Sequence, residues 1–462
     1  MQPFDQLTFW FVLIDLTLVS IALLHMLYQR RSPQSLSTWL LTIILLPYIG
    51  VLIYFFFGLR KSYSKRFKLK ITQDPVTKIK PDKGLQYELD NLMINDHIAG
   101  TTENNHISLI DSDTEAFTIL MQQIRQAKQQ ILLETYVFEL DATGKHLLQE
   151  LTKKAKQGVD VYFLIDAIGS FRASLNKKAF HELKRAGGKV AFFQPIWPNI
   201  ITSQINLRNH RKIYLFDQSI LLTGGLNISN DYLGEDTDKI RWIDLLFKIE
   251  GPACFHYQNI FNADWLFATQ EERPQAQLPA KLSHGEILQS IPSGPDIASD
   301  TLYEALLHCI YHAQKSIKIA TPYFIPDNNV MRALMIAVKR GVRVSVLTPL
   351  KSDHWIFDFG RSSYMRELYD AGANMMYYKG NMLHAKLIIF DDNVAMSGSA
   401  NFDYRSLFLN YEMVHFLYCK ATINKLSAWY EKNTIEAQAY QPTNSKASRF
   451  TENISRIFAP IL

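Results

Sequence analysis

Cysteine is scarce in this sequence, and metal-binding spacings are missing around its histidine motifs. Cys254, Cys309 and Cys419 are the only cysteines in 462 residues, and they lie far apart. An odd number of distant cysteines forms no CxxC pair and argues against a disulfide framework. No HExxH motif occurs either. We therefore expect buried thiols in a reducing compartment, and a protein that uses no metal and no cofactor.

A large excess of charge of one sign is also lacking. The chain has 49 basic and 44 acidic residues, a formal net charge of +5 and a pI near 8.8. Such a mild excess matters only where the charges cluster. Because 47% of the residues are hydrophobic and 20% are charged, the composition argues against a disordered chain. The length favours more than one core-forming unit.

The N-terminus has two long apolar stretches. Residues 36–58 contain no charged residue and are long enough to cross a bilayer as one helix, for which about 20 residues are needed. Residues 7–28 are nearly as apolar but contain Asp15, whose charge is costly in lipid. No lysine or arginine precedes them, which argues against a signal peptide. The sequence predicts a transmembrane helical hairpin; the alternative is a buried hairpin in a soluble core.

Basic residues indicate the orientation of this hairpin. The tail before the first stretch has none, the connecting loop has Arg30 and Arg31, and no acid interrupts the basic group that follows the second stretch, Arg60, Lys61, Lys65, Arg66, Lys68 and Lys70. A hairpin places the tail and the main body on one side of the membrane. The positive-inside bias then favours a body on the cytoplasmic side, with the exit group near anionic headgroups.

The rest of the chain contains an internal repeat. Residues 127–166 and 313–349 both read as strand, polar loop, amphipathic helix, glycine and strand. Residues 182–193 and 367–378 each read as a helix end, a glycine and a further strand, and residues 210–227 and 384–401 follow in the same order. Three matched segments in one order indicate a duplicated α/β unit. Strands that alternate with helices favour parallel or mixed sheets covered by helices.

The third matched segment carries the chemistry. Side chains alternate along a strand, so the histidine and lysine of each HxK motif point the same way: His210 with Lys212, and His384 with Lys386. The acids at the same later offset, Asp217 and Asp391, would point to the other face, which makes a structural role the better reading from alternation alone. Two copies with equal offsets are far more specific than one HxK motif.

Each copy continues into a turn of small residues. The turns are Gly224-Gly225-Leu226-Asn227 and Gly398-Ser399-Ala400-Asn401, and such turns let backbone approach an anion. Together the copies offer two imidazoles, two ammonium groups, two carboxamides and one hydroxyl. Lysines and amides can surround a phosphoryl group, while one histidine attacks phosphorus and the other moves a proton. The residues therefore predict phosphodiester cleavage or transfer.

A nucleophilic imidazole needs its second ring nitrogen held. Asp244 follows the first motif and Glu412 follows the second, each on or next to a predicted strand. Either could act as the orienting carboxylate of a triad. The alternative is an acid on a partly exposed strand.

These motifs resemble the phospholipase D superfamily, and nearly the whole chain resembles the bacterial cardiolipin synthases. The resemblance rests on the two HxKxxxxD motifs, the apolar N-terminus, "ETYVF", "WIDLLFKIEGP", "TPYFIPD" and the terminal "ISRIFAPIL". It implies two pseudo-symmetric halves, residues 109–280 and 281–462, each a mixed sheet flanked by helices, after a membrane hairpin (1–70) and a linker (71–108). It implies catalytic roles for His210, Lys212, Asp217, His384, Lys386 and Asp391, and substrate contacts for Asn227, Asp244, Ser399, Asn401 and Glu412.

The implied reaction joins two phosphatidylglycerol molecules into cardiolipin and releases glycerol. Membrane phospholipid is then the partner, no nucleic acid is involved, and the bacterial cytoplasmic membrane is the location of a multi-pass protein. The oligomeric state stays open, as does the choice of nucleophile, for which we favour His210. Three alternatives share the same residues: a hydrolase that uses water, a nuclease with a basic stripe, and a lipid-binding protein without activity.

Overall fold

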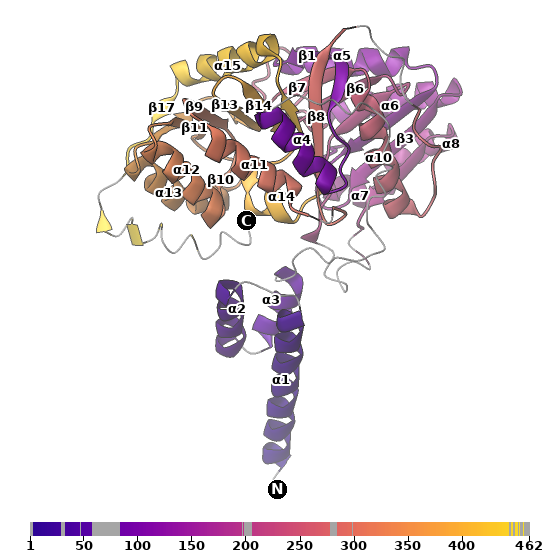
Figure 1. Cartoon of the computed structure of the whole chain (residues 1–462). Helices are drawn as coiled ribbons and strands as arrows, with labels where there is room; N and C mark the ends of the chain where they lie inside the picture. Colours follow the sequence, from indigo (N-terminus) through magenta and orange to yellow (C-terminus); the bar gives the residue numbers. More distant parts are fainter. Residues whose placement is uncertain are drawn as a thin grey trace. The chain divides into compact units, whose positions relative to one another are not determined.

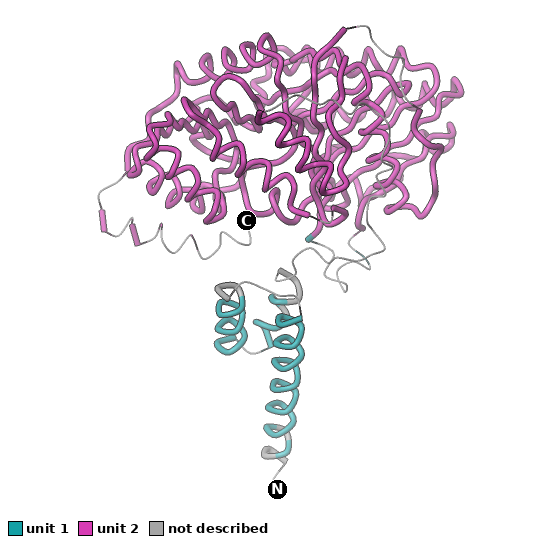
Figure 2. Tube along the Cα trace, viewed as in Figure 1, with its two compact units in different colours: residues 1–62, 196–206 teal, residues 63–195, 207–462 magenta. Residues whose placement is uncertain are grey.

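The computed structural model describes residues 3–28, 33–46, 48–57, 84–195, 197, 206–277, 284–297, 299–442 and six positions between 445 and 456. The chain forms two compact units (Figure 2). One comprises residues 1–62 and 196–206, and the other comprises residues 63–195 and 207–462. The exit group of basic residues from Arg60 to Lys70 lies outside the described residues.

The N-terminal unit contains one long apolar helix. Helix α1 (Pro3–Tyr28) includes residues 8–28, a stretch of 21 residues with a mean hydropathy of 2.1. Its length and composition suffice to cross a membrane, and it is the only described helix that meets this criterion. Asp15 lies within it without interrupting it.

The second apolar stretch is not one helix, so the expectation of an uninterrupted span over residues 36–58 is wrong. Helix α2 (Pro33–Leu45) ends two residues before Pro47, because a proline has no N–H to continue a helix and restricts the residue before it. Tyr48 has φ 63°, and helix α3 (Ile49–Phe57) then begins. A Cβ on Gly50 would lie 2.7 Å from the carbonyl oxygen of Thr42, so only glycine permits this close return.

Two contacts with α1 fix the direction of α3. The Tyr48 hydroxyl donates to the carbonyl of Phe11 at 2.6 Å, and the Tyr54 hydroxyl lies 2.7 Å from Nδ1 of His25. Helix α3 therefore begins beside the first half of α1 and ends near Tyr28, the end of α1 from which the connecting loop leaves. Two complete spans would have returned the chain to the end of α1 that carries the N-terminal tail; the divided stretch returns it to the opposite end.

The second unit is built on a 15-stranded mixed sheet (Figure 1). The first half of the repeat provides β1 (Thr102–Ile110), β2 (Gln130–Thr135), β3 (Asp160–Asp166), β4 (Lys189–Phe193), β5 (Ile213–Phe216), β6 (Ile220–Gly224) and β7 (Leu246–Glu250). The second half provides β8 (Glu286–Ser293), β9 (Ser316–Ala320), β11 (Arg343–Pro349), β12 (Asn374–Tyr378), β13 (Leu387–Phe390), β14 (Val394–Gly398), β16 (Glu412–Leu417) and β17 (Gln438–Ala439). Strands β10 (Phe324–Ile325) and β15 (Phe402–Asp403) form a separate parallel pair.

The strand order shows the duplication directly. Strands β1 and β8 pair antiparallel at the centre of the sheet. Outward from this pair the order is β7-β6-β5-β2-β3-β4 on one side and β16-β14-β13-β9-β11-β12 on the other, with β17 added at the second edge. In each half three strands are parallel and the others are antiparallel. The prediction of two pseudo-symmetric halves with mixed sheets is confirmed.

Helices cover both faces of the sheet. The first half contributes α5 (Asp113–Gln126), α6 (Ala142–Lys156), α7 (Phe171–Leu175), η2 (Lys177–Phe180), α8 (His181–Arg185) and α10 (Ala253–Thr269). The second contributes α11 (Thr301–His312), α12 (Asn328–Lys339), α13 (Trp355–Asp370), α14 (Tyr404–Phe408) and α15 (Lys420–Ile435). Local signals start several of them: Ser112, Asp141 and Asp327 cap α5, α6 and α12 by accepting backbone N–H groups.

Three hydrophobic cores result from this layering. One belongs to each half, and the third lies on the face covered by α10 and α15 and takes residues from both halves, such as Phe247 and Leu417. The halves therefore fold as one body. Helix α4 (Leu85–Asn95) precedes β1 and packs on α11 through Leu89 and Met93, so part of the range suggested as a linker belongs to this body.

Candidate functional site

Two equivalent segments bring the halves together. The first motif segment (residues 207–212) leads into β5, and the second motif segment (residues 381–386) leads into β13. The backbone N–H of His210 donates to Tyr411 at 2.8 Å, and that of His384 donates to Ile243 at 2.8 Å. Each motif segment thus pairs with the residue that precedes the carboxylate of the other half.

As a result, each predicted carboxylate contacts the histidine of the other half. Nδ1 of His210 lies 3.0 Å from Oε2 of Glu412, and Nδ1 of His384 lies 2.6 Å from Oδ2 of Asp244. All four side chains are buried. The structure therefore places each predicted carboxylate on a histidine, but on the histidine of the opposite half. With Nδ1 held by a carboxylate, Nε2 is the nitrogen left for chemistry.

The two lysines lie against their own histidines. Nζ of Lys212 donates to the carbonyl of His210 at 2.7 Å, and Nζ of Lys386 lies 2.6 Å from Nδ1 of His384. Burial lowers the pKa of Lys212 to about 7 and that of Lys386 to about 8. Both ammonium groups are thus held where an anion would stabilise them.

Burial and positive neighbours favour the neutral form of both imidazoles. Burial lowers the pKa of His210, although Glu412 opposes this. Burial lowers the pKa of His384 well below its usual range, and Lys386, Lys212 and His210 lower it further. Because groups from both halves act on one imidazole, the two motifs form a single electrostatic site.

The two carboxylates differ in their surroundings. Burial raises the pKa of Asp244 to about 6, although Lys386 opposes this. Burial also raises the pKa of Glu412, but His210, Lys212 and the Ser399 hydroxyl outweigh it, and the net pKa is lowered. Ser399 donates to Oε2 of Glu412 at 2.5 Å. The first half has Gly225 instead, where a Cβ would lie only 2.2 Å from Oδ1 of Asp244.

The two predicted asparagines lie at equivalent positions, just after β6 and just after β14, but differ in their hydrogen bonding. Oδ1 of Asn227 accepts the backbone N–H of Val137 at 3.2 Å. Oδ1 of Asn401 is buried without a hydrogen-bond partner among the described residues. Its amide is therefore available to a ligand, whereas that of Asn227 supports the strand end.

Asp217 and Asp391 are not part of this cluster. Each carboxylate accepts three backbone N–H groups where the neighbouring strand begins, at residues 128–130 and 314–316. Seven residues of nearly extended chain separate each from its histidine, roughly 20 Å along the strand. The geometry agrees with the face alternation in the sequence and argues against the catalytic role that the resemblance implies for both residues.

Aromatic residues that the motif analysis passed over line the site. The Tyr136 ring lies 4.8 Å from the His210 ring and 5.6 Å from Nζ of Lys212. The Tyr232 hydroxyl lies 3.2 Å from Nε2 of His384, and the Trp242 ring is 5.6 Å from the His384 ring. The available signal was position: Tyr136 directly follows β2, which pairs with β5, and Trp242 lies two residues before Asp244.

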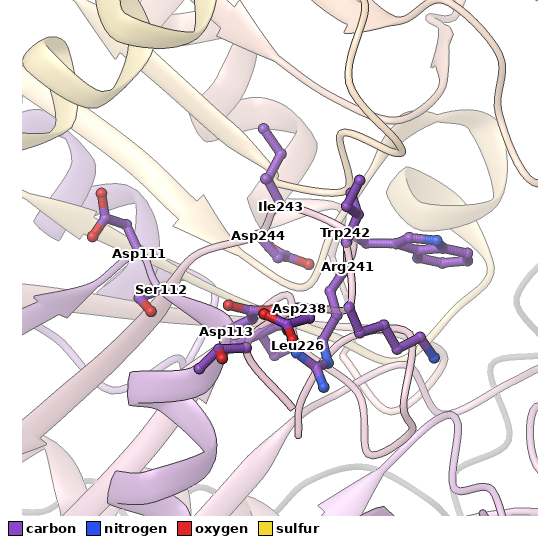
Figure 3. A pocket seen from close by; sticks show the side chains of 12 residues that line it. Asp111, Ser112, Asp113, Leu226, Asp238, Arg241, Trp242, Ile243 and Asp244 are labelled. Atoms are coloured by element: carbon purple, nitrogen blue, oxygen red, sulfur yellow. Dashed lines mark hydrogen bonds and ion pairs between the residues drawn. The ribbon is translucent and has the colours of Figure 1, made fainter. Parts of the chain in front are cut away.

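A cavity of about 270 Å³ approaches the site beside Asp244. Figure 3 shows its acidic wall: Asp113 and Asp238 lie beside Arg241, which donates to Asp113 at 3.1 Å, and Asp111 lies farther from Arg241. The histidines and lysines of the two HxK motifs do not line it, although Lys239 does. These carboxylates disfavour a phosphate, whereas the two lysines of the histidine–lysine cluster favour one.

Known proteins resemble the chain in sequence and in structure. The family model described as cardiolipin synthase, PLD-like domain matches residues 120–265 and 306–434, and a phospholipase D-nuclease N-terminal model matches residues 17–58. A cardiolipin synthase of Clostridium perfringens is 34% identical, over 94% of this chain and 95% of its own length. The major cardiolipin synthase of Bacillus subtilis is 32% identical, over 96% and 97%.

A solved structure supports the fold independently of close sequence similarity. The phosphatidylserine synthase of Haemophilus influenzae aligns with a TM-score of 0.60 over 81% of this chain and 98% of its own, at 15% identity. The two halves carry matching HxK motifs, and each histidine contacts a carboxylate of the other half. The sequence is also similar to curated relatives over nearly their full length. The chain belongs to the cardiolipin synthase family of the phospholipase D superfamily, and it is an enzyme of that superfamily.

Proposed function

We propose that this chain is a membrane-bound phosphatidyltransferase that makes cardiolipin and glycerol from two phosphatidylglycerol molecules through a phosphohistidine. The observation that carries this proposal is the crossed pair of buried imidazoles, each held at Nδ1 by a carboxylate of the other half. Two imidazole Nε2 atoms beside two lysine ammonium groups suit a reaction in which one imidazole forms and later breaks a bond to phosphorus while the other moves a proton.

In the first step, Nε2 of His210 attacks the phosphorus of phosphatidylglycerol. The N–P bond forms as the P–O bond to the glycerol headgroup breaks, and His384 gives its proton to the leaving oxygen. Two observations support this division of roles. No described residue donates to or accepts from Nε2 of His210, whereas Nε2 of His384 already faces the Tyr232 hydroxyl at 3.2 Å, where the leaving oxygen would sit.

In the second step, the headgroup hydroxyl of another phosphatidylglycerol attacks the phosphorus. His384 takes the hydroxyl proton, the P–N bond breaks, and cardiolipin leaves with His210 restored. The Asn401 Oδ1 could accept a hydrogen bond from a substrate hydroxyl, because it lacks a protein donor among the described residues.

Substrate binding would prepare the proton donor. Lys386 and Lys212 contribute to the low pKa of His384. A phosphate anion between the two ammonium groups cancels that repulsion, so the pKa of His384 rises when a proton is needed. The lysines also supply the positive charge that a metal ion would otherwise give, and both carboxylates are directed at histidines. We therefore propose a metal-independent reaction.

The N-terminal unit supports one membrane crossing and a body on the cytoplasmic side. Helices α2 and α3 have 13 and 9 residues, about 20 and 14 Å, and neither spans a hydrocarbon core of about 30 Å. We propose that α1 crosses and that α2 and α3 enter and leave by one face. Arg30, Arg31 and the exit group then share the cytoplasmic side, in accord with the positive-inside bias. An N-terminal tag should resist protease in sealed inside-out vesicles.

The test of the reaction uses the full-length protein in vesicles of phosphatidylglycerol with excess chelator. Cardiolipin and glycerol should appear in equal amounts, and parent protein quenched during turnover should carry phosphorus on His210, read by mass spectrometry of the trapped peptide. Phosphatidic acid without cardiolipin would show a hydrolase instead. Phosphorus on any other side chain contradicts the proposed nucleophile, and strong DNA binding without lipid turnover would favour a nuclease.

A further inference from the structure

Helices α4 and α11 form an antiparallel pair on the body, side by side in Figure 1. Leu89 and Met93 of α4 share a core with Leu302, Leu306 and Cys309 of α11. Beyond this core, polar groups join the helices at both ends. At one end the Thr301 hydroxyl donates to Oδ2 of Asp96 at 2.6 Å.

At the other end, three metal-binding side chains converge. His308 and His312 are one turn apart on α11, and their ring centroids are 4.1 Å apart. Nε2 of His308 lies 2.7 Å and Nε2 of His312 lies 3.2 Å from the same atom, Oε2 of Glu88 on α4. The three ligand atoms all lie within 4.8 Å of one another.

A hydrogen bond at Nδ1 of His312 fixes which ring nitrogen faces Glu88 as an acceptor. Its Nδ1 lies 2.9 Å from the carbonyl oxygen of His308, a contact that requires a proton on Nδ1. In the neutral ring, Nε2 then carries a lone pair, and this lone pair points at a carboxylate oxygen. A cation between them removes the repulsion. Metal-ligating histidines regularly donate their other N–H to a backbone carbonyl in this way.

The surroundings favour a cation that prefers nitrogen ligands. His312 lies at the C-terminal end of α11, where the helix dipole attracts positive charge. Glu88 and His312 are exposed and His308 is half-buried, so solvent can complete the coordination. Two imidazoles with one carboxylate form a set that suits zinc and related divalent transition metals rather than calcium or magnesium.

We propose that Glu88, His308 and His312 bind a divalent transition-metal cation, such as Zn²⁺, that fastens helix α4 to helix α11. The site is separate from the histidine–lysine cluster. Its effect is on stability, because a metal that binds the folded body and not the unfolded chain raises the unfolding temperature. Helix α4 is the first described element after the N-terminal unit, so the metal secures the start of the body against fraying.

The test uses full-length, metal-stripped protein in detergent, purified without a histidine tag. Added Zn²⁺ should bind at one ion per chain after desalting, and it should raise the unfolding temperature by a few degrees. The double variant His308→Gln, His312→Gln should bind no zinc and show no rise. Because His312 is exposed and His308 is only half-buried, the metal-free unfolding temperature of the variant should lie close to that of the metal-free parent.

His146→Gln provides the matched control. His146 also lies on a helix between two carboxylates, Glu150 and Glu235, but has no second imidazole beside it, so the variant should bind zinc as the parent does. The proposal is overturned if the parent binds no zinc, if the double variant binds as much, or if zinc leaves the unfolding temperature of the parent unchanged. Cardiolipin formation below the unfolding temperature should not change when zinc is removed, so this test and the test of the reaction can fail separately.

Discussion

The first and second motif segments have the same backbone pairing, but different kinds of side chain surround their histidines. In the first, Arg208, Asn209 and Arg211 surround His210, and all are buried. In the second, the equivalent positions are Met382, Leu383 and Ala385, buried as well and entirely apolar. One half holds its histidine in a charged network, and the other holds it by packing.

The charged network extends well beyond the first motif segment. Nη1 of Arg211 donates to both carboxylate oxygens of Asp264 at 2.7–2.8 Å, and Nη2 donates to Asp296 at 2.9 Å. Arg208 is paired in the same way with Asp166. Burial and repulsion from Asp264 raise the pKa of Glu134 well above its usual range, although Arg211 and Asn209 oppose this.

This difference shows that a duplicated fold can keep its geometry while the halves diverge in electrostatics. Nε of Arg211 donates to the backbone carbonyl of Glu412 at 3.1 Å, and Ser399 donates to the carboxylate of the same residue. The partner of His210 is therefore fixed at both ends and stays ionised. Asp244, the partner of His384, has neither support and has a raised pKa. The asymmetry fits a nucleophile at His210 and a proton carrier at His384.

The largest expected loss of activity comes from removing the carboxylate that contacts the histidine, a feature that both halves share. Glu412→Gln and Asp244→Asn should each lower kcat by about 10²–10⁴-fold, because an amide can hold the imidazole in the wrong tautomer. Rates of cardiolipin formation measure the loss, and circular dichroism checks the fold. A folded variant that keeps more than a tenth of the activity would show that its carboxylate does not orient the histidine.

The next largest effect is a loss of stability at the buried Arg211, which the second half lacks. Arg211→Met should cost about 3–5 kcal/mol of unfolding free energy, because it leaves Asp264 and Asp296 buried without their cation. Urea unfolding of the full-length protein in detergent measures this cost.

A matched variant tests the cause. Arg211→Met combined with Asp264→Asn and Asp296→Asn removes the charges together and should recover a substantial part of the loss, since the second half manages with Ala385. Equal losses in the single and triple variants would mean that packing of the arginine, and not charge pairing, supports the first motif segment.

A smaller, pH-dependent effect is expected at Ser399, which has only Gly225 as its counterpart. The net pKa of Glu412 is lowered in the folded protein, so its contribution to stability is present above its unfolded pKa and is lost as pH falls through the folded pKa. Ser399→Ala removes a donor to this carboxylate and should cost about 1.5–3 kcal/mol at neutral pH. The cost should shrink in acid, where the carboxylate is protonated.

Unfolding free energies measured from neutral to acid pH provide the check. Ser397→Ala is the control, because Ser397 is buried two residues before Ser399 but donates to the backbone carbonyl of Lys386, and a carbonyl does not titrate. Its cost should therefore stay constant with pH. A constant cost for Ser399→Ala as well would show that the hydroxyl does not act through the charge of Glu412.

Much of the fold could be predicted from the sequence because the signals are local and repeated. The matched segments indicated two halves with mixed sheets, and strand alternation separated Asp217 and Asp391 from the histidines. The crossing of Asp244 and Glu412 could not be predicted, since it depends on β1 and β8 joining the halves at the centre of the sheet. The break at Pro47 was visible as a proline, but uninterrupted apolar length outweighed it.

Other parts of the two sites were hidden for different physical reasons. Nothing in the sequence indicated the role of Arg211, because its partners Asp264 and Asp296 lie more than 50 residues away along the chain. The spacing of His308 and His312 was visible as one helical turn. Their third ligand, Glu88, comes from a helix in the range suggested as a linker, and only tertiary packing reveals it.

The smallest effect is expected where the halves are most alike. Asp217 and Asp391 accept the same three backbone N–H groups in their two halves, with one oxygen serving two of the groups and the other serving one. Asparagine keeps one acceptor oxygen, so Asp217→Asn and Asp391→Asn should each lose about 1 kcal/mol of stability. Neither should change kcat, because both lie roughly 20 Å along the strand from the histidines. Urea unfolding and turnover on the same samples decide the matter: a fall in kcat of tenfold or more in a stably folded variant would return that aspartate to the catalytic set and end the symmetry of the two strand ends.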